Sequence, residues 1–94
     1  MLKIIAIFTA KEGHEEALFA SLAKLIEPTR AEAGCFHYDL YRDPSAPGRF
    51  VFDESWESEA HLEAHRQTPH LTGMRNDTKD ILASRQVYVL ERAA

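Results

Sequence analysis

The sequence contains a single cysteine, Cys35, and this scarcity excludes several kinds of site. One thiol cannot form a disulfide within the chain, and it cannot build a metal cluster held by cysteines. No neighbour in the sequence is expected to lower the pKa of this thiol. Cys35 is therefore predicted to be a small apolar group in a strand rather than a nucleophile.

Long hydrophobic runs and clusters of positive charge are also missing. The apolar run in MLKIIAIFTAKEG is too short to cross a bilayer, and it lacks the cleavage site and charged flank of a signal peptide. Lys and Arg number 11 against 15 Asp and Glu, for a net charge of −4, and the basic residues are scattered singly. Nucleic acid and membranes are therefore not expected partners, and we expect a cytoplasmic protein.

What remains is the composition of an ordinary globular domain. The 94 residues are 45% hydrophobic and 28% charged, without a low-complexity segment. A chain of this length has room for one hydrophobic core. We therefore expect a single domain over residues 1–94.

The pattern of apolar residues predicts an α+β domain with the order βαββαβ. Strands are expected at residues 2–9, 35–43, 49–57 and 85–91, with the middle two joined into a hairpin by PSAPG. A helical stripe runs from about residue 15 to residue 33, kinked or restarted at Pro28 and stopped by Gly34. Two shorter helices are expected after Ser58 and after Thr68-Pro69, which have the sequences of helix N-caps.

This order is the ferredoxin-like plan, a four-stranded antiparallel sheet with helices on one face. Every strand nevertheless carries apolar or aromatic residues on both sides, so the face without helices needs a cover. At this chain length the simplest cover is a second copy. We predict a homodimer in which two sheets pack face to face.

Three of the five histidines fall within ESEAHLEAHRQTPH, residues 57–70. His61 and His65 are four residues apart on a helix, a spacing that can chelate zinc. However, Glu63 does not have the position of the glutamate in metalloprotease motifs, and a third ligand, His70, would have to cross a helix break. We predict no metal here, and a zinc protein remains the alternative.

A helical wheel separates these histidines. His61 lies at the solvent edge of its helix, whereas His65 lies on the inner side and faces the sheet that bears Trp56. His65 can be a buried structural histidine or a functional base, and both interpretations stay open. His70 lies near the positive end of the next helix, which disfavours imidazolium and makes this residue a candidate neutral base.

One face of the third strand mixes aromatic side chains with a carboxylate. Its residues are Phe50, Phe52, Glu54 and Trp56. A carboxylate among aromatic rings indicates a cavity that contains polar groups, and Trp56 is either core or part of the cavity wall. On the last helix Arg75 shares a stripe with Met74, so it is predicted to face inward, where it could pair with Glu54 or hold a substrate oxygen.

Three stretches of the sequence together resemble a known family. They are KEGHEE at the start of the first helix, AEAGCFHYDLYRD at the start of the hairpin, and FDESWESEAHLEAHRQTPH. In order and spacing they resemble the antibiotic biosynthesis monooxygenase family over nearly the whole chain. The resemblance implies a dimeric α+β barrel in which the C-terminal strand reaches over the partner and each subunit has a pocket between sheet and helices.

Members of this family with known activity convert hydroquinones or phenolic polyketides to quinones with O2, without metal, flavin or haem. The resemblance therefore implies a cofactor-independent monooxygenase acting on a small hydroxylated aromatic, most simply a quinol. A base removes a phenolic proton, and the electron-rich anion reduces O2 in a dry aromatic pocket. The implied residues are the bases His65 or His70, the wall and indole donor Trp56, and the substrate-binding Glu54, Phe52, Arg75 and Met74.

The chain departs from two branches of that family. Phe52 stands where the polyketide-oxidising branch has an asparagine donor. Ile5 and Arg75 stand where haem-degrading relatives have an asparagine and an iron-ligating histidine, which argues against haem. Because membership of a fold does not fix a reaction, a non-catalytic or isomerase-like small-molecule binding protein is the alternative.

Overall fold

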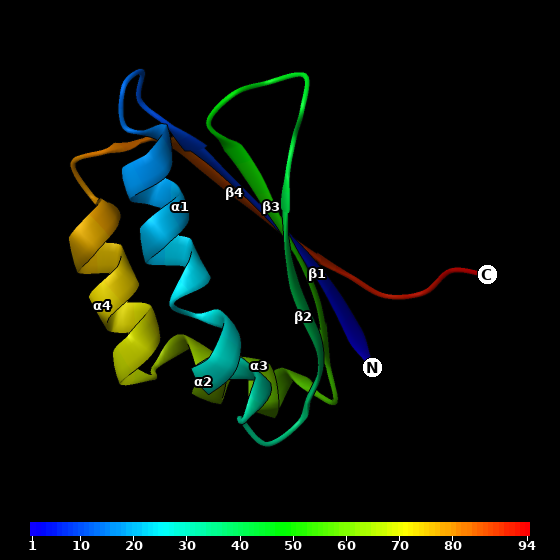
Figure 1. The fold of residues 1–94 in the computed structure, drawn as a ribbon. Helices are drawn as coiled ribbons and strands as arrows, with labels where there is room; N and C mark the ends of the chain where they lie inside the picture. The colour runs from blue at the N-terminus through cyan, green and yellow to red at the C-terminus, as the bar shows by residue number, and fades with distance from the viewer.

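The computed structural model describes all 94 residues, Met1–Ala94, as four strands and four helices (Figure 1). The strands are β1 (Leu2–Ala10), β2 (Cys35–Arg42), β3 (Arg49–Trp56) and β4 (Leu82–Leu90), and the helices are α1 (Glu15–Ala23), α2 (Ile26–Arg30), α3 (Glu59–Arg66) and α4 (Pro69–Thr78). All strand pairs are antiparallel, in the order β2-β3-β1-β4. The predicted ferredoxin-like α+β fold is confirmed.

All four helices lie on one face of the sheet, and no element of this chain covers the other face (Figure 1). Alternate residues of β1 and β3 bury their side chains toward the helices, as the period of a strand requires. They pack against the buried apolar residues Leu18, Leu22 and Leu25 of the first helical segment. None of the helices has both the length and the apolar character needed to span a membrane.

The helical stripe predicted over residues 15–33 folds as two helices. α1 ends at Ala23 and α2 starts at Ile26, so the break lies before Pro28 instead of at it. Pro28 is the third residue of α2, in the first turn, where a backbone N–H has no partner within the helix in any case. Gly34 adopts a φ of +78° and turns the chain into β2.

The two predicted N-caps are confirmed. Ser58 Oγ accepts a hydrogen bond from the backbone N–H of His61 at 3.3 Å, and Thr68 Oγ1 accepts one from Leu71 at 3.4 Å. α4 ends at Thr78, and β4 begins at Leu82 instead of residue 85. Ile81 and Leu82 therefore lie beyond the end of α4.

A change of register at the start of β2 decides which residues face the helices. Cys35 pairs with Trp56, but the next paired residue is His37, opposite Ser55. The unpaired residue between Cys35 and His37 forms a β-bulge. The bulge lets Cys35 pack against the hydrophobic cluster that contains Trp56, while His37 faces outward. Burial first, and then the charge of Glu32, raise the pKa of the Cys35 thiol, which agrees with its predicted apolar role.

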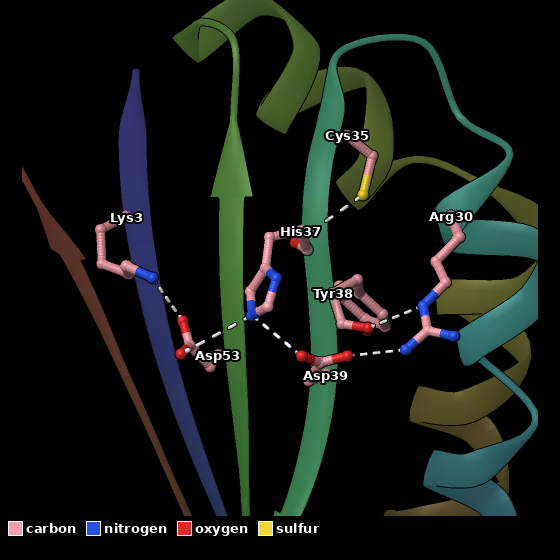
Figure 2. A network of polar contacts seen from close by, with 7 residues as sticks. All are labelled: Lys3, Arg30, Cys35, His37, Tyr38, Asp39 and Asp53. Carbon is pink, nitrogen blue, oxygen red and sulfur yellow. Dashed lines mark hydrogen bonds and ion pairs between the residues drawn. The ribbon is translucent and has the colours of Figure 1, made fainter.

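The face without helices carries a line of ion pairs (Figure 2). Asp39 and Asp53 are direct partners on β2 and β3, and two carboxylates at such positions repel each other. His37 Nε2 lies 3.0 Å from Asp39 and 3.8 Å from Asp53, while Lys3 and Arg30 each reach one carboxylate at 2.6 Å. Lys3 and Arg30 offset part of this repulsion, while the backbone ladder with β3 holds β2 in the sheet.

The same face also exposes apolar side chains. Tyr41, Tyr88 and Leu90 are 54%, 48% and 45% exposed, and Ile5 and Ile7 lie half-buried between them on the central strand β1. Beyond β4 the last residues leave the sheet and extend away from the helices (Figure 1). This face therefore combines an apolar centre with a charged border on β2 and β3.

Gly34 provides a test of the packing between β2 and α3. A Cβ at this position would collide with the imidazole of His61, whereas Gly13, with a similar φ of +86°, has open space. Gly13→Ala should lower the free energy of unfolding by about 1–2 kcal/mol through the left-handed backbone alone. Gly34→Ala should cost more, as measured by urea denaturation.

The excess cost of Gly34→Ala comes from one side chain. In the double variant Gly34→Ala/His61→Ala the excess should therefore disappear, after the cost of His61→Ala alone is subtracted. If Gly34→Ala destabilises the protein no more than Gly13→Ala does, the contact with His61 is not a packing constraint.

Candidate active site

A cavity of about 40 Å³ lies between the helix-bearing face of the sheet and helices α3 and α4. Most of its wall is apolar, with Phe52 from β3 and Met74 from α4 among the buried lining residues. The polar lining residues are Tyr38, Glu54, His65, Arg66, Arg75 and Arg85. An apolar cavity with a few convergent polar groups is the usual form of a small-molecule site.

His65 is the most deeply buried titratable base of this cavity, at 4% exposure. Its ring lies 4.5 Å from the Trp56 ring between centroids and meets the Tyr38 ring edge-on at 5.7 Å. Burial lowers the pKa of His65, and the hydrogen bond from its Nδ1 to Glu32 only partly opposes this. The imidazole is therefore neutral near pH 7.

The hydrogen bond to Glu32 also fixes the tautomer of His65. Nδ1 lies 2.7 Å from Glu32 Oε2, and because an ionised carboxylate can only accept, Nδ1 carries the proton. Nε2 then has a free lone pair, and it makes no hydrogen bond within the chain. The structure thus places a neutral, oriented base in the wall of the cavity.

Glu32 joins this base to a second histidine. The same oxygen, Oε2, lies 2.8 Å from Nε2 of His70, and the side chain of Glu32 is only 14% exposed. His70 does not line the cavity; it borders a separate surface hollow beside Lys24 and Asp77. Of the two candidate bases from the sequence, only His65 therefore borders the cavity, and His70 lies behind Glu32.

Trp56 lies behind the cavity wall instead of forming it. It is fully buried, and its indole N–H donates to Glu54 Oε1 at 2.9 Å. The donor that was expected to orient a substrate oxygen is thus already used, because a strand places residues i and i+2 on the same face. Glu54 itself lines the cavity, and burial raises its pKa to about 7 against the opposing effect of the Trp56 hydrogen bond.

Phe52 and Met74 occupy their predicted places, but Arg75 differs. Phe52 stacks on Tyr38 with ring centroids 4.8 Å apart. Arg75 borders the cavity with an exposed side chain and forms no ion pair with Glu54. The reason is the helix period: α4 buries Leu71, Met74 and Thr78, and the position after Met74 lies about 100° round the helix.

The structure adds site residues that the sequence did not reveal. They are Glu32, Tyr38, Arg66 and Arg85. Strand alternation could have placed Arg85 on the inner face beside Val87, and hairpin register could have paired Tyr38 with Glu54. Glu32 lies in a turn and meets His65 from 33 residues away, so no local pattern marks it.

Glu32, His65 and His70 also form the one donor set of the chain that could hold a metal ion. One ligand atom from each lies within 4.8 Å of the others, and zinc accepts two imidazoles and a carboxylate. His61 is not part of this set. It points to Ser58, whose Oγ lies 2.8 Å from its Nδ1. The ligands considered from the sequence are thus only partly brought together.

The comparison with known families decides what kind of protein carries this cavity. Residues 1–77 match the family described as antibiotic biosynthesis monooxygenase. The chain belongs to this family. The family resemblance and the monooxygenase class predicted from the sequence are therefore confirmed.

Two relatives and one solved structure are similar to most or nearly all of this chain. "Probable quinol monooxygenase YgiN" of Escherichia coli K12 is 33% identical over 101 residues, covering 97% of each chain. The crystal structure of PA3566 from Pseudomonas aeruginosa is 39% identical, with a TM-score of 0.95 over 99% of this chain and 94% of that one. The uncharacterized protein sll1783 of Synechocystis is 36% identical over 73 residues, which are 78% of this chain but only half of that protein.

Glu54 should make the stability of this family member depend on pH in a defined direction. Its pKa rises from 4.5 to about 7 on folding, so between these values the folded state keeps a proton that the unfolded state releases. The stabilisation is complete below about pH 4.5 and is lost as the pH rises through 7. The free energy of unfolding of the wild type, relative to Glu54→Gln, should fall by up to roughly 3 kcal/mol across this range.

The comparison with Glu54→Gln cancels the effect of other groups. The lowered pKa of His65 has the opposite effect, because protonation of this buried imidazole at acid pH destabilises the folded protein. This effect is the same in the wild type and in Glu54→Gln, so it cancels. Urea denaturation at half-unit pH steps measures the difference. A difference that stays constant from pH 4.5 to pH 7 would show that Glu54 ionises as an ordinary surface carboxyl does.

Proposed function

We propose that this chain is a cofactor-independent monooxygenase that oxidises a small hydroxylated aromatic, a phenol or quinol, with O2. The observation that carries the proposal is His65, a buried neutral imidazole that borders an apolar cavity and is held by Glu32. The family and the name of the relative YgiN support the reaction class. The substrate and the identity of the base are our inference.

In the proposed reaction Nε2 of His65 accepts the proton of a phenolic hydroxyl. The phenolate is electron-rich, so it transfers one electron to O2, and the two radicals combine to a peroxide at a ring carbon that carries hydrogen. The imidazolium of His65 returns its proton to this peroxide, and loss of water then breaks the O–O and C–H bonds and leaves a carbonyl. One oxygen atom enters the ring and the other leaves as water, so the substrate supplies all the electrons.

The cavity provides the surroundings that this chemistry needs. Its apolar wall limits the water around His65, which keeps the pKa of His65 low and protects the reduced oxygen intermediate from stray protons. Burial, and then the charge of Glu54, raise the pKa of Tyr38 above its usual value, so its hydroxyl stays protonated. Tyr38 can therefore donate a hydrogen bond to an oxygen that gains negative charge.

Glu32 and His70 act behind the base. Glu32 holds His65 in the tautomer whose Nε2 is free, as a carboxylate does for the histidine of a catalytic triad. His70, 22% exposed, connects the same carboxylate oxygen to the surface. We assign both as positioning residues, because neither borders the cavity.

The size of the cavity favours a small substrate. With the side chains in their observed conformations, the cavity of about 40 Å³ has room for a few water molecules. A single aromatic ring needs the least enlargement of this cavity, whereas a fused polycyclic substrate would need much more. A one-ring phenol or quinol is thus the substrate class that we propose.

Oxygen uptake by the purified protein tests the role of His65. His65→Ala should lower kcat/KM with simple hydroquinones by about 10²–10⁴-fold, the usual contribution of a general base. His70→Ala should cost on the order of tenfold, as loss of an orienting partner does. Parallel measurement of H2O2 separates oxygen insertion, which releases none, from plain oxidation of the quinol, which releases one H2O2 per O2.

The pH profile provides a signature that a structural role would not produce. The acid limb of kcat/KM should lie below pH 6.5, because the pKa of His65 is lowered. Glu32→Gln keeps an acceptor for Nδ1 but removes the charge that raises this pKa, so the acid limb should move to still lower pH. Uptake no faster than autoxidation in the wild type would leave the alternative, a non-catalytic binding protein with the same cavity.

A chelator serves as the control for the cluster of Glu32, His65 and His70. Activity should survive treatment with EDTA and dialysis. If it is lost and Zn²⁺ restores it, the cluster is a metal site and the role of His65 as a free base is overturned.

We also propose that two chains associate through the sheet face that carries no helices, with the C-terminal residues reaching the partner. The support is the apolar centre of that face, formed by Ile5, Ile7 and Tyr88, and the direction of the chain end (Figure 1). Light scattering should give a mass of twice 10.7 kDa.

Two neighbouring residues of β4 make a matched pair of variants for this association. Tyr88 and Val89 are similarly exposed, at 48% and 46%, but they point to opposite faces of the sheet. Tyr88→Lys should weaken the dimer at least tenfold, whereas Val89→Lys should leave it intact. Equal effects of the two substitutions, or a wild-type monomer at micromolar concentration, would contradict this arrangement.

A further inference from the structure

Three arginines border the cavity, and each comes from a different element. Arg66 ends α3, Arg75 lies on α4 and Arg85 lies on β4. All three side chains are exposed, so they lie at the mouth of the cavity, while His65 and Glu54 lie deeper. The chain as a whole carries a net charge of −4, so the positive charge at this opening contrasts with the net charge of the protein.

The three guanidinium groups are poorly neutralised within the chain. Arg66 has one exposed contact, with Glu63 at 3.5 Å, and such a pair contributes little. Arg75 and Arg85 form no ion pair, and the guanidinium of Arg85 lies 5.8 Å over the ring of Phe8. After burial, the charges of the other two arginines lower the pKa of Arg85, which means that the groups are close enough to repel.

The cavity itself offers one carboxyl group against these charges. Glu54 is the only acidic lining residue, and it is buried and accepts the indole N–H of Trp56. With a pKa of about 7 it is only partly ionised at neutral pH. Positive charge at the mouth therefore exceeds negative charge, and this excess attracts an anion.

A phenolate formed during the reaction accounts for one negative charge, close to the base. Three arginines at the mouth exceed that need, and guanidinium forks are suited to planar oxyanions. We propose that the substrate is a hydroxylated aromatic ring with a separate carboxylate substituent, which Arg66, Arg75 and Arg85 hold at the mouth while a ring hydroxyl points to His65. This inference rests on the proposed function and adds the substrate class.

A matched pair of compounds tests the inference. They are 2,5-dihydroxybenzoate and its methyl ester, which share the ring and both hydroxyls and differ in one negative charge. By calorimetry at pH 7.5 and low salt, the acid should bind at least tenfold more tightly than the ester. This preference should shrink several-fold between 20 and 300 mM NaCl, because the arginines are exposed to screening.

Charge-removing variants locate the effect. Arg75→Gln and Arg85→Gln should each reduce the preference for the acid about three- to tenfold, with little change in affinity for the ester. Arg49→Gln, at an exposed arginine on β3 that does not border the cavity, is the matched control and should leave the preference unchanged. Thermal unfolding checks that each variant is folded. The salt dependence of binding is measured on the wild type, so it tests the inference even if a variant does not fold.

The outcomes separate this inference from the proposed function. Equal binding of acid and ester overturns the inference, and oxygen uptake with both would still support the function. A preference for the acid that depends on Arg75 and Arg85, without any oxygen uptake, supports an anion-binding cavity and overturns the function. A preference that Arg49→Gln reduces as strongly as Arg85→Gln also overturns the inference, since it would then reflect general surface charge.

Discussion

The candidate site depends on one carboxylate oxygen, Oε2 of Glu32, which lies within 2.8 Å of a nitrogen of His65 and of His70. These residues come from the turn before β2, from α3 and from α4, so the contact ties three segments together at the end of the cavity. A buried carboxylate is costly to leave without partners, and a buried imidazole has two possible tautomers. Each group resolves the difficulty of the other: the histidines supply donors, and the carboxylate fixes the orientation and tautomer of His65.

The cavity next to this contact combines two electrostatic settings. Near His65 the wall is apolar, so charged forms are disfavoured: the pKa of His65 falls and that of Glu54 rises to about 7. At the mouth three arginines meet solvent. The cavity therefore has a neutral base at its inner end and cations at its opening. This arrangement suits a ligand that carries a charge at one end and loses a proton at the other. Trp56 lies behind the cavity wall, and the hydrogen bond from its indole N–H holds the carboxyl group of Glu54 in place.

The sheet separates this site from the face that we propose as a dimer interface. Strand alternation sends Phe52, Glu54 and Trp56 to the helices and sends Asp53 to the opposite side. The β-bulge after Cys35 maintains this division where β2 begins: it brings Cys35 beside Trp56 and turns His37 toward Asp39 (Figure 2). The apolar centre of the outer face has no cover within one chain. The cavity thus lies on the helix-bearing side of the sheet, whereas the opposite face is uncovered in the single chain.

The sequence alone determined the element order, the N-caps at Ser58 and Thr68 and the face shared by Phe52, Glu54 and Trp56, because caps and strand periods are local properties of neighbouring residues. It also carried enough matching stretches to indicate the family. It could not show that Glu32 meets His65, that the Trp56 N–H is used by Glu54, or that Arg85 joins Arg66 and Arg75. These contacts join residues from different elements, or depend on a side-chain rotamer, and only tertiary packing and strand register decide them.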